Sequence, residues 1–289
     1  GYLGPALIVH GTDEQKRRFL GPISRAEIEF HQGFSEPDFG SELTGLRTSA
    51  VRDGDDYLVN GQKIWGGHIR SADYTFLLVR TDLEAPKHRG ISLIVIPTDT
   101  PGIRFEEFEN MSGGMQNIVY YDNVRVPIRD ALIGEENRGW YIGATVLNHE
   151  RAFLNYAAIG QRLFDDLVNL WREQGSHVKK NGPALALRCK LSSMAIEFEV
   201  CRNLAYRVGW MQGQGQDPSY EASIVKIFGS EMVQRFSHVA YETLGLFSQL
   251  TRLNQNPRYH FLSGRVEHMI QYQLSFTLMG GTSEIQRDV

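Results

Sequence analysis

Between residues 28 and 135, short apolar runs are separated by Asp, Gly and Pro, the pattern of β-strands joined by turns. The predicted strands cover residues 56–59, 62–65, 74–79, 91–96, 102–108 and 117–121. Asn60-Gly61 lies between the first two and predicts a two-residue type I′ hairpin turn. Because no helix-length segment separates these strands, they predict an antiparallel β-barrel or sandwich rather than repeated βαβ units.

After Gly134 the apolar residues follow the spacing of helices, at i, i+3, i+4 and i+7. This spacing predicts four long helices, over residues 139–173, 184–211, 219–250 and 264–278. Four helices of this length with short connections predict a bundle. Residues 1–27 predict one surface helix and a connector. The predicted domains are therefore a short N-terminal segment (1–27), a β-domain (28–135) and a helical bundle (136–289).

The composition is that of an ordinary globular protein, with 42% hydrophobic and 22% charged residues among 289. A net charge of −4 gives no basic footprint for nucleic acid or an anionic membrane, and no apolar stretch predicts a membrane span. Cys189 and Cys201 lie twelve residues apart on one predicted helix, which excludes a disulfide framework and a four-ligand zinc site. The chain lacks an initiating methionine and stops within a predicted helix, so we expect both ends to be trimmed.

Two glycine-containing segments can carry chemistry, and each has a purely structural alternative. The polar loop from Phe34 to Glu42 offers hydroxyl and backbone N–H groups to a planar polar ligand; the alternative is an ordinary turn before a strand. Gly280-Gly281 allow close backbone approach, and Thr282 or Ser283 can cap a helix whose N-terminus suits an anion. The alternative there is a glycine linker between two helices. No dinucleotide-fold or Walker-type glycine loop occurs.

Glu150 is the third candidate. It shares a helical stripe with Leu147, Leu154 and Ala157. A carboxylate on an apolar stripe is desolvated, which makes it a stronger base near neutral pH. The structural alternative is a buried ion pair with an arginine of a facing helix, such as Arg207 or Arg235.

Six segments, in order along nearly the whole chain, resemble the signatures of the acyl-CoA dehydrogenase family. They are residues 11–16, 34–42, 59–65, 122–127, 134–140 and 281–287. The resemblance implies an α+β multidomain fold: an N-terminal helical domain, mostly absent here, a middle β-domain and a C-terminal four-helix bundle. FAD would lie between the last two domains.

The resemblance also implies an activity, the α,β-dehydrogenation of an acyl-CoA thioester to a trans-2-enoyl-CoA in fatty acid β-oxidation. A base takes the α-proton while flavin N5 accepts a β-hydride. Electrons usually pass to an electron-transfer flavoprotein, and the enzymes are tetramers. The expected location is the cytoplasm of a bacterium or the mitochondrial matrix.

The position of the catalytic base separates members of the family. Most carry it in the loop before Gly-Thr-Ser, at the position of Gly280, and glycine cannot abstract a proton. The isovaleryl-specific and long-chain members carry a glutamate on the first bundle helix directly before an arginine, which matches Glu150-Arg151. The resemblance therefore implies that Glu150 is the base and that the backbone N–H of Gly280 donates to the thioester carbonyl.

The remaining site residues follow from the same position-by-position match. The FAD-binding residues that it implies are Phe34, Ser35, Gly40, Ser41, Trp65, Gly66, Gly67, Arg172, Thr282 and Glu284. Residues implied to approach the acyl-CoA are Ser41, Asn148, Arg151 and Gly281.

Three segments depart from the family pattern. The family's Trp-x-Thr, whose hydroxyl bonds flavin N5, reads Trp65-Gly66-Gly67. The two motifs that hold FAD across a subunit interface are altered around Arg172 and in Leu244-Gly245-Leu246-Phe247-Ser248. The alternatives are therefore a non-catalytic or half-site subunit of a heterotetramer, and an acyl-CoA oxidase. Glycines at 66, 67 and 280 also leave room for a bulky or branched acyl group.

Overall fold

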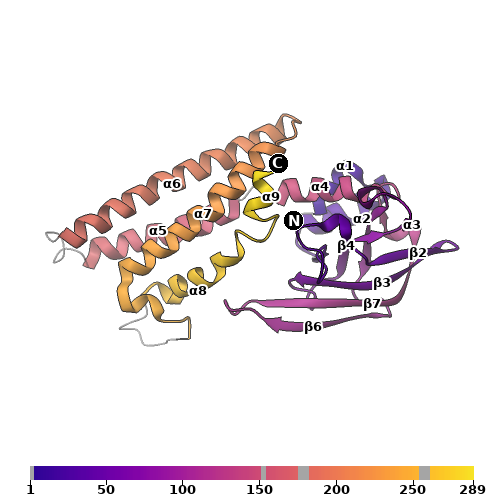
Figure 1. Ribbon diagram of the computed structural model, residues 1–289, viewed down its shortest axis with the longest axis horizontal. Coiled ribbons are helices and arrows are strands. Elements are labelled where there is room, and N and C mark those ends of the chain that lie inside the picture. Colours follow the sequence, from indigo (N-terminus) through magenta and orange to yellow (C-terminus); the bar gives the residue numbers. More distant parts are fainter. Residues whose placement is uncertain (1–2, 151–153, 175–181, 254–260) are drawn as a thin grey trace. The chain divides into compact units, whose positions relative to one another are not determined.

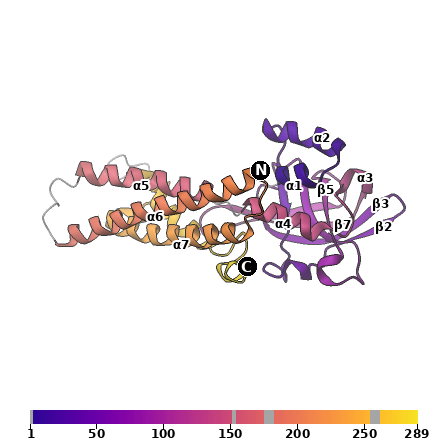
Figure 2. The same ribbon diagram turned by 90° about the horizontal axis from the view of Figure 1, so that it is seen from above.

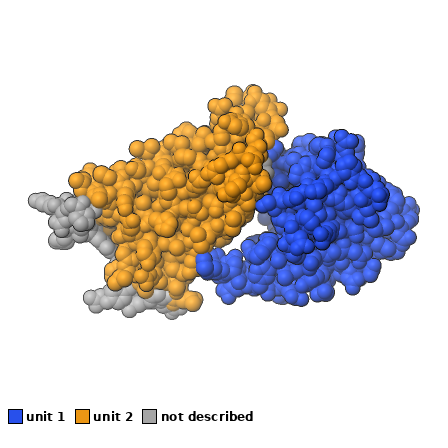
Figure 3. Space-filling view, in the orientation of Figure 1, with its two compact units in different colours: residues 1–149 blue, residues 150–289 orange. Residues whose placement is uncertain are grey.

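The computed structural model describes residues 3–150, 154–174, 182–253 and 261–289. The chain divides into two compact units, Gly1–His149 and Glu150–Val289, which Figure 3 shows in different colours. Each unit has its own hydrophobic core, and each is described here by itself.

The first unit is built on eight strands that form one sheet. They are β1 (Phe30–Gly33), β2 (Ser49–Asp53), β3 (Asp56–Gly66), β4 (Tyr74–Arg80), β5 (Ile91–Pro97), β6 (Ile103–Glu109), β7 (Met115–Pro127) and β8 (Leu132–Ile133). Their order is β6-β7-β3-β2-β4-β5-β8, with β1 beside β4. Pairing is antiparallel, as predicted, except that β1 and β2 each pair with β4 in parallel.

The sheet is open and folds over at β2, which joins β4 through the single residue pair Ser49↔Arg80. Buried side chains of β3 and β7, such as Val59 and Val119, share one core with Leu77 of β4 and Ile94 of β5. Figure 1 shows β3, β7 and β6 in one layer of this sandwich. A second core covers the outer faces of β4 and β5, and strands buried on both faces are continuous apolar runs in the sequence.

The predicted hairpin at Asn60-Gly61 is wrong, because β3 runs without a break through both residues. The turn lies earlier, between the paired residues Asp53 and Asp56. Gly61 serves a different purpose: its φ is +144°, and a Cβ there would lie 2.6 Å from Thr48 Oγ1. Glycine is needed for this close approach rather than for a type I′ turn.

The prediction of a single N-terminal surface helix is also wrong, since two helices precede β1. They are α1 (Leu3–His10) and α2 (Asp13–Ser24). Leu3, Ala6 and Leu7 of α1 are buried in the core on the outer face of β4 and β5. Helix α2 begins with a capping box, in which Thr12 accepts from the N–H of Gln15 and the Gln15 side chain accepts from that of Thr12.

The second unit is a helical bundle. Its helices are α5 (Leu154–Gln174), α6 (Gly182–Gly213), α7 (Ser219–Leu244), α8 (Arg265–Tyr272) and α9 (Ser283–Arg287). Helices α5 to α8 share one core, and α5, α6 and α7 run side by side in Figures 1 and 2. At its centre the rings of Phe164, Phe198 and Phe236 are 5.2–6.0 Å apart. The predicted bundle is therefore confirmed.

The helix predicted over residues 139–173 is described as α4 (Gly139–Glu150) and α5, and residues 151–153 lie outside the described residues. Two other predicted boundaries need correction. Helix α7 ends at Leu244, because Gly245 adopts a φ of +56°. After α8 the chain tightens into a 3-10 turn, Gln273–Ser275, instead of continuing as an α-helix to Leu278.

Two general predictions can be compared with the described ranges. None of the helices there is long and apolar enough to cross a membrane. No group of three or more His, Cys, Asp or Glu side chains in those ranges could hold a metal ion. Cys189 is exposed and Cys201 buried, and both are free thiols. Burial raises the pKa of Cys201 to about 11.

Candidate active site

The loop after β1 is held in shape by a buried carboxylate, Glu36. One of its oxygens accepts from the N–H of Arg47 (2.7 Å), and the other accepts from the N–H of Thr48 (2.9 Å) and from Lys63 Nζ (2.8 Å). Lys63 Nζ also donates to the carbonyl of Phe34 (3.1 Å). Both side chains are buried, with 6% of Glu36 and 1% of Lys63 exposed. This pair therefore fixes the backbone at Phe34 and Ser35.

The charge states of the pair follow from burial and mutual attraction. Burial lowers the pKa of Lys63 to about 8, although Glu36 opposes the shift. Burial alone would raise the pKa of Glu36, but the Lys63 ammonium and the N–H donors outweigh it and lower the pKa. An ion pair is thus present at neutral pH. The pair could not be predicted from the sequence, because nothing in the spacing of residues 36 and 63 shows that both are buried.

The same loop lies against the end of β3. The carbonyl of Ser35 accepts from the N–H of Ile64 at 2.9 Å, which places the loop beside Trp65. The Phe34 ring is buried and packs edge-on against Phe76 at 5.6 Å, whereas Gly40 and Ser41 are exposed. The structure therefore brings Phe34 and Ser35 close to the Trp65 segment.

Trp65 is unusual for a large apolar side chain, since 59% of its surface is exposed. Its backbone φ is +70°, in the left-handed region that few non-glycine residues adopt. Its indole packs edge-on against Phe108 at 5.5 Å. Strained backbone and exposed aromatic rings gather at ligand sites, which marks this position as a candidate contact for a planar ligand.

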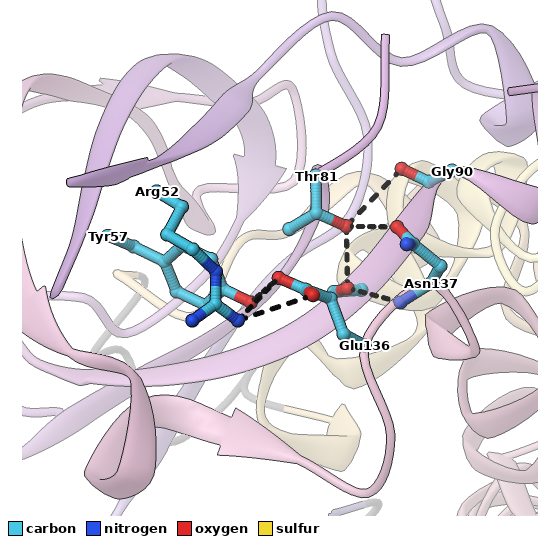
Figure 4. Close-up of polar contacts among 7 residues, drawn as sticks. Arg52, Tyr57, Thr81, Gly90, Glu136 and Asn137 are labelled. Carbon is cyan, nitrogen blue, oxygen red and sulfur yellow. Dashed lines mark hydrogen bonds and ion pairs between the residues drawn. The ribbon is translucent and has the colours of Figure 1, made fainter. Parts of the chain in front are cut away.

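Helix α4, which carries Asn148 and ends at Glu150, is anchored at its start by residues of the 134–140 segment (Figure 4). Glu136 accepts from the hydroxyl of Tyr57 and pairs with Arg52 at 3.3 Å. Asn137 accepts from the hydroxyl of Thr81 at 2.6 Å. These contacts tie the segment directly before α4 to β2, to β3 and to the residue after β4.

Glu150 lies beside Gly280, two residues that are far apart in sequence. A Cβ built on Gly280 would be 3.9 Å from Glu150 Oε1, and Glu150 Oε2 is buried. Gly280 and Gly281 have φ values of +68° and +85°, which explains why both are glycine. The two arginines of the structural alternative pair elsewhere, Arg207 with Glu221 (3.2 Å) and Arg235 with Glu197 (2.5 Å).

The Gly280 turn is braced from within the bundle. Gln286 Nε2 donates to the carbonyl of Gly280 (3.3 Å), and the fully buried Lys226 donates to the carbonyl of Thr277 (3.1 Å). Thr282 caps α9 by accepting from the N–H of Ile285 at 3.2 Å, which confirms the predicted cap. The backbone of this turn is therefore held on both sides of Gly280.

The other predicted site residues fall at separate places. Arg172 is exposed near the end of α5, and Glu284 is in the first turn of α9. Asn148 is partly buried in α4, whereas Arg151 lies outside the described residues. Of the predicted residues, Phe34 and Ser35 thus lie beside the Trp65 segment in the first unit, and Glu150 lies beside Gly280 in the second.

Comparisons with known families agree with the motif resemblance. The family "Acyl-CoA dehydrogenase, middle domain" matches residues 32–124, and "Acyl-CoA dehydrogenase, C-terminal domain" matches residues 137–289. Acyl-CoA dehydrogenase FadE26 of Mycobacterium tuberculosis is 39% identical, over 99% of this chain and 72% of its own length. FadE29 of the same organism is 34% identical, over 99% and 73%.

Solved structures show the same relationship. The Tcur3481-Tcur3483 steroid ACAD matches with a TM-score of 0.89 and 33% identity, over 99% of this chain and 73% of that chain. The ChsE4-ChsE5 complex of Mycobacterium tuberculosis matches with a TM-score of 0.87 and 36% identity, over the same shares. The chain therefore belongs to the acyl-CoA dehydrogenase family, FAD-dependent oxidoreductases that act on acyl-CoA.

Proposed function

We propose that this chain converts an acyl-CoA thioester to its trans-2-enoyl-CoA, with Glu150 as the base that removes the α-proton. The main support for this proposal is the position of the Glu150 carboxylate. Its Oε1 would lie 3.9 Å from a Cβ built on Gly280. Most members of the family carry their base at the residue that is Gly280 here. A carboxylate that reaches the same place from α4 supports a base supplied by the helix instead of the loop.

The residues of the first unit fit a flavin. Trp65 leaves its indole exposed, and the neighbouring Ile64 is bonded to the backbone of Ser35, so an isoalloxazine ring can pack on the indole close to this loop. FAD, when bound, supplies the acceptor for the two electrons that leave the substrate. We assign the isoalloxazine contact to Trp65, Gly66 and Gly67.

The fit at the other end of FAD is uneven. Arg172 and the Thr282 turn offer donors to a diphosphate. Glu284 fits less well, because its carboxylate is negative at neutral pH, and we expect it to turn away from a diphosphate that binds there. A hydrogen bond to its own backbone N–H and the Thr282 hydroxyl lower its pKa further.

The chain's own residues divide the proton chemistry between them. A thioester α-proton is much less acidic than a carboxylic acid, so the base has to be shielded from water, as the buried Oε2 of Glu150 is. Negative charge develops on the thioester oxygen as the proton leaves. A fixed backbone donor stabilises that charge, and the braced turn at Gly280 can present one.

We further propose a bulky, ring-bearing acyl group as the substrate class. A relative of known structure with 33% identity is a steroid ACAD. In this chain Gly67 is open, since a Cβ there would meet only the Met115 carbonyl at 3.8 Å, and Gly280 likewise carries no side chain. At each of these two positions, glycine removes the side chain that a threonine at 67 or a glutamate at 280 would have, which supports a bulky substrate.

An anaerobic titration tests this function. We expect purified protein to contain FAD and its flavin absorbance to bleach within one turnover when a steroid-ring acyl-CoA is added. A linear acyl-CoA of equal carbon number is the matched control and should bleach it more slowly. Equal rates would contradict the proposed substrate class, and no bleaching by any thioester would contradict the proposed reaction.

Hydrogen peroxide yield in air distinguishes an oxidase from a dehydrogenase that uses electron-transfer flavoprotein.

The second candidate is a half-site subunit of a heteromer. It is favoured by the changed interface motifs and by relatives solved as two-component complexes. Helix α6 supports assembly of either kind, because Ile196, Tyr206 and Trp210 are 59–66% exposed on it. A shallow hollow of about 620 Å³ lies on the same helix, lined by Ala195, Ile196, Glu199, Val200, Asn203, Leu204 and Arg207. We assign this face to a subunit interface.

We expect Ile196→Asp to lower the oligomeric state, because it places a charge in an apolar interface. Sedimentation velocity measures the change, and Glu173→Lys, on an exposed turn of α5, is the control. An unchanged sedimentation coefficient for Ile196→Asp would contradict the interface. Flavin per chain then separates the two functions, since one FAD per chain excludes the half-site subunit.

A further inference from the structure

The end of β3 contains a β-bulge centred on Trp65. Ile64 pairs with Ile118 of β7 and Gly66 pairs with Asn117, so Trp65 is the extra residue between two consecutive pairs. A bulge turns the extra side chain out of the alternation of its strand. This accounts for both the φ of +70° and the exposed indole of Trp65.

The residue after the bulge is held on one side by His31. A Cβ built on Gly66 would overlap His31 Nε2 and lie 2.8 Å from Cδ2 and 3.0 Å from Cε1. At the neighbouring Gly67 a Cβ would meet only one atom, at 3.8 Å. Neither glycine has a positive φ, so the imidazole, not the backbone conformation, requires glycine at position 66.

The imidazole has little freedom to move aside. His31 is 1% exposed, and its Nδ1 is 3.0 Å from the hydroxyl of Thr75, which lies 3.2 Å from the hydroxyl of Tyr121. The pairing of β1 with β4 places His31 directly opposite Thr75. Burial lowers the pKa of His31 to about 4, so the ring packed on Gly66 is uncharged at neutral pH.

Asn117 holds Gly66 from β7. Its Nδ2 donates to the carbonyl of Gly66 at 2.9 Å, and the side chain is 1% exposed. Gly66 is thus packed against a buried ring from β1 and bonded to a buried amide from β7. Both contacts act on Gly66, where pairing with β7 resumes after the bulge, and the Trp65 indole remains exposed to solvent.

We infer that His31 and Asn117 are positioning residues that lock the bulge at Gly66 and so hold the Trp65 indole in place for the isoalloxazine ring. The inference rests on the proposed function only in assigning the flavin to Trp65. The lock itself is a property of the β-domain. It also explains why the residue directly after Trp65 is glycine, because a side chain at 66 cannot coexist with His31.

The test compares Gly66→Ala with the double variant His31→Ala/Gly66→Ala, in the full chain. The first variant creates the overlap and the second removes it. We measure the urea midpoint of the FAD-free protein, the dissociation constant for FAD, and the residual fluorescence of bound FAD, which a stacked indole quenches. Gly67→Ala is the control for the urea midpoint only.

We expect Gly66→Ala to lower the urea midpoint far more than Gly67→Ala and to weaken FAD binding about tenfold or more. Bound FAD should fluoresce more strongly in it. The double variant should regain most of the midpoint, the affinity and the quenching. If Gly66→Ala does not fold, recovery of folding and FAD binding in the double variant supports the lock, and failure to recover overturns it.

Two other results would overturn the inference. If Gly66→Ala and Gly67→Ala unfold alike, His31 does not lock the bulge. Gly66→Ala could lower the urea midpoint and the double variant restore it, while FAD affinity and fluorescence stay at the wild-type values in both. In that case the lock does not position Trp65 for the flavin. Anaerobic bleaching of the unaltered protein by an acyl-CoA tests the proposed function separately, because it does not depend on either outcome.

Discussion

We expect Glu150→Gln to slow the bleaching of bound FAD by an acyl-CoA by about 10²–10⁴-fold, the usual contribution of a general base. Glutamine has nearly the same shape as glutamate but cannot take the α-proton at neutral pH. FAD content and thermal unfolding should stay unchanged, because the substitution preserves packing beside Gly280. Stopped-flow absorbance under anaerobic conditions measures the rate. Bleaching at the unaltered rate would show that another group is the base.

Moving the base from position 150 to position 280 gives a more specific control. A Cβ at position 280 would lie 3.9 Å from Glu150 Oε1, so the double variant Glu150→Gly/Gly280→Glu places a carboxylate in the same region from the Gly280 turn instead of α4. The φ of +68° at Gly280 costs a non-glycine residue roughly 1–2 kcal/mol. We therefore expect partial recovery, at least about tenfold above Glu150→Gly alone, which corresponds to 1.36 kcal/mol of the barrier. No recovery would argue against Glu150 and position 280 serving the same α-proton.

Lys63→Met should lower the free energy of unfolding by about 3–5 kcal/mol, because it leaves the buried Glu36 carboxylate without its cation. The loss also removes the donor to the Phe34 carbonyl, so we expect weaker FAD binding as well. Urea unfolding of the FAD-free protein measures the first effect, and titration with FAD measures the second.

The chain provides a matched control for this variant. Lys87 pairs with Glu42, but both side chains are more than half exposed, so Lys87→Met should cost less than about 1 kcal/mol. Glu36→Leu/Lys63→Met removes both charges and should recover much of the lost stability, since no buried charge remains unpaired. Equal costs for Lys63→Met and Lys87→Met would contradict the role of burial.

Local sequence patterns were enough to establish the family and the order of a β-region followed by helices. Alternation and helical periodicity are local properties, so β3 to β7 and the long helices after residue 138 could be recognised, whereas the short strands β1, β2 and β8 were not predicted. Cap chemistry is local too, and Thr282 could be recognised as a cap from its neighbours. The six motifs identified the family because each can be recognised from its own residues and spacing, independently of the rest of the chain.

Which polar residues are buried, and what they contact, depends on the tertiary structure. Glu36 meets Lys63, and His31 meets Gly66, because the fold packs β1 and the loop after it against β3, which is distant in sequence. The predicted hairpin at Asn60-Gly61 was wrong for the same reason. Glycine is required there by the close approach of Thr48 and not by a turn. Burial depends on which elements pack together, and that is a property of the whole fold, absent from the local spacing of residues.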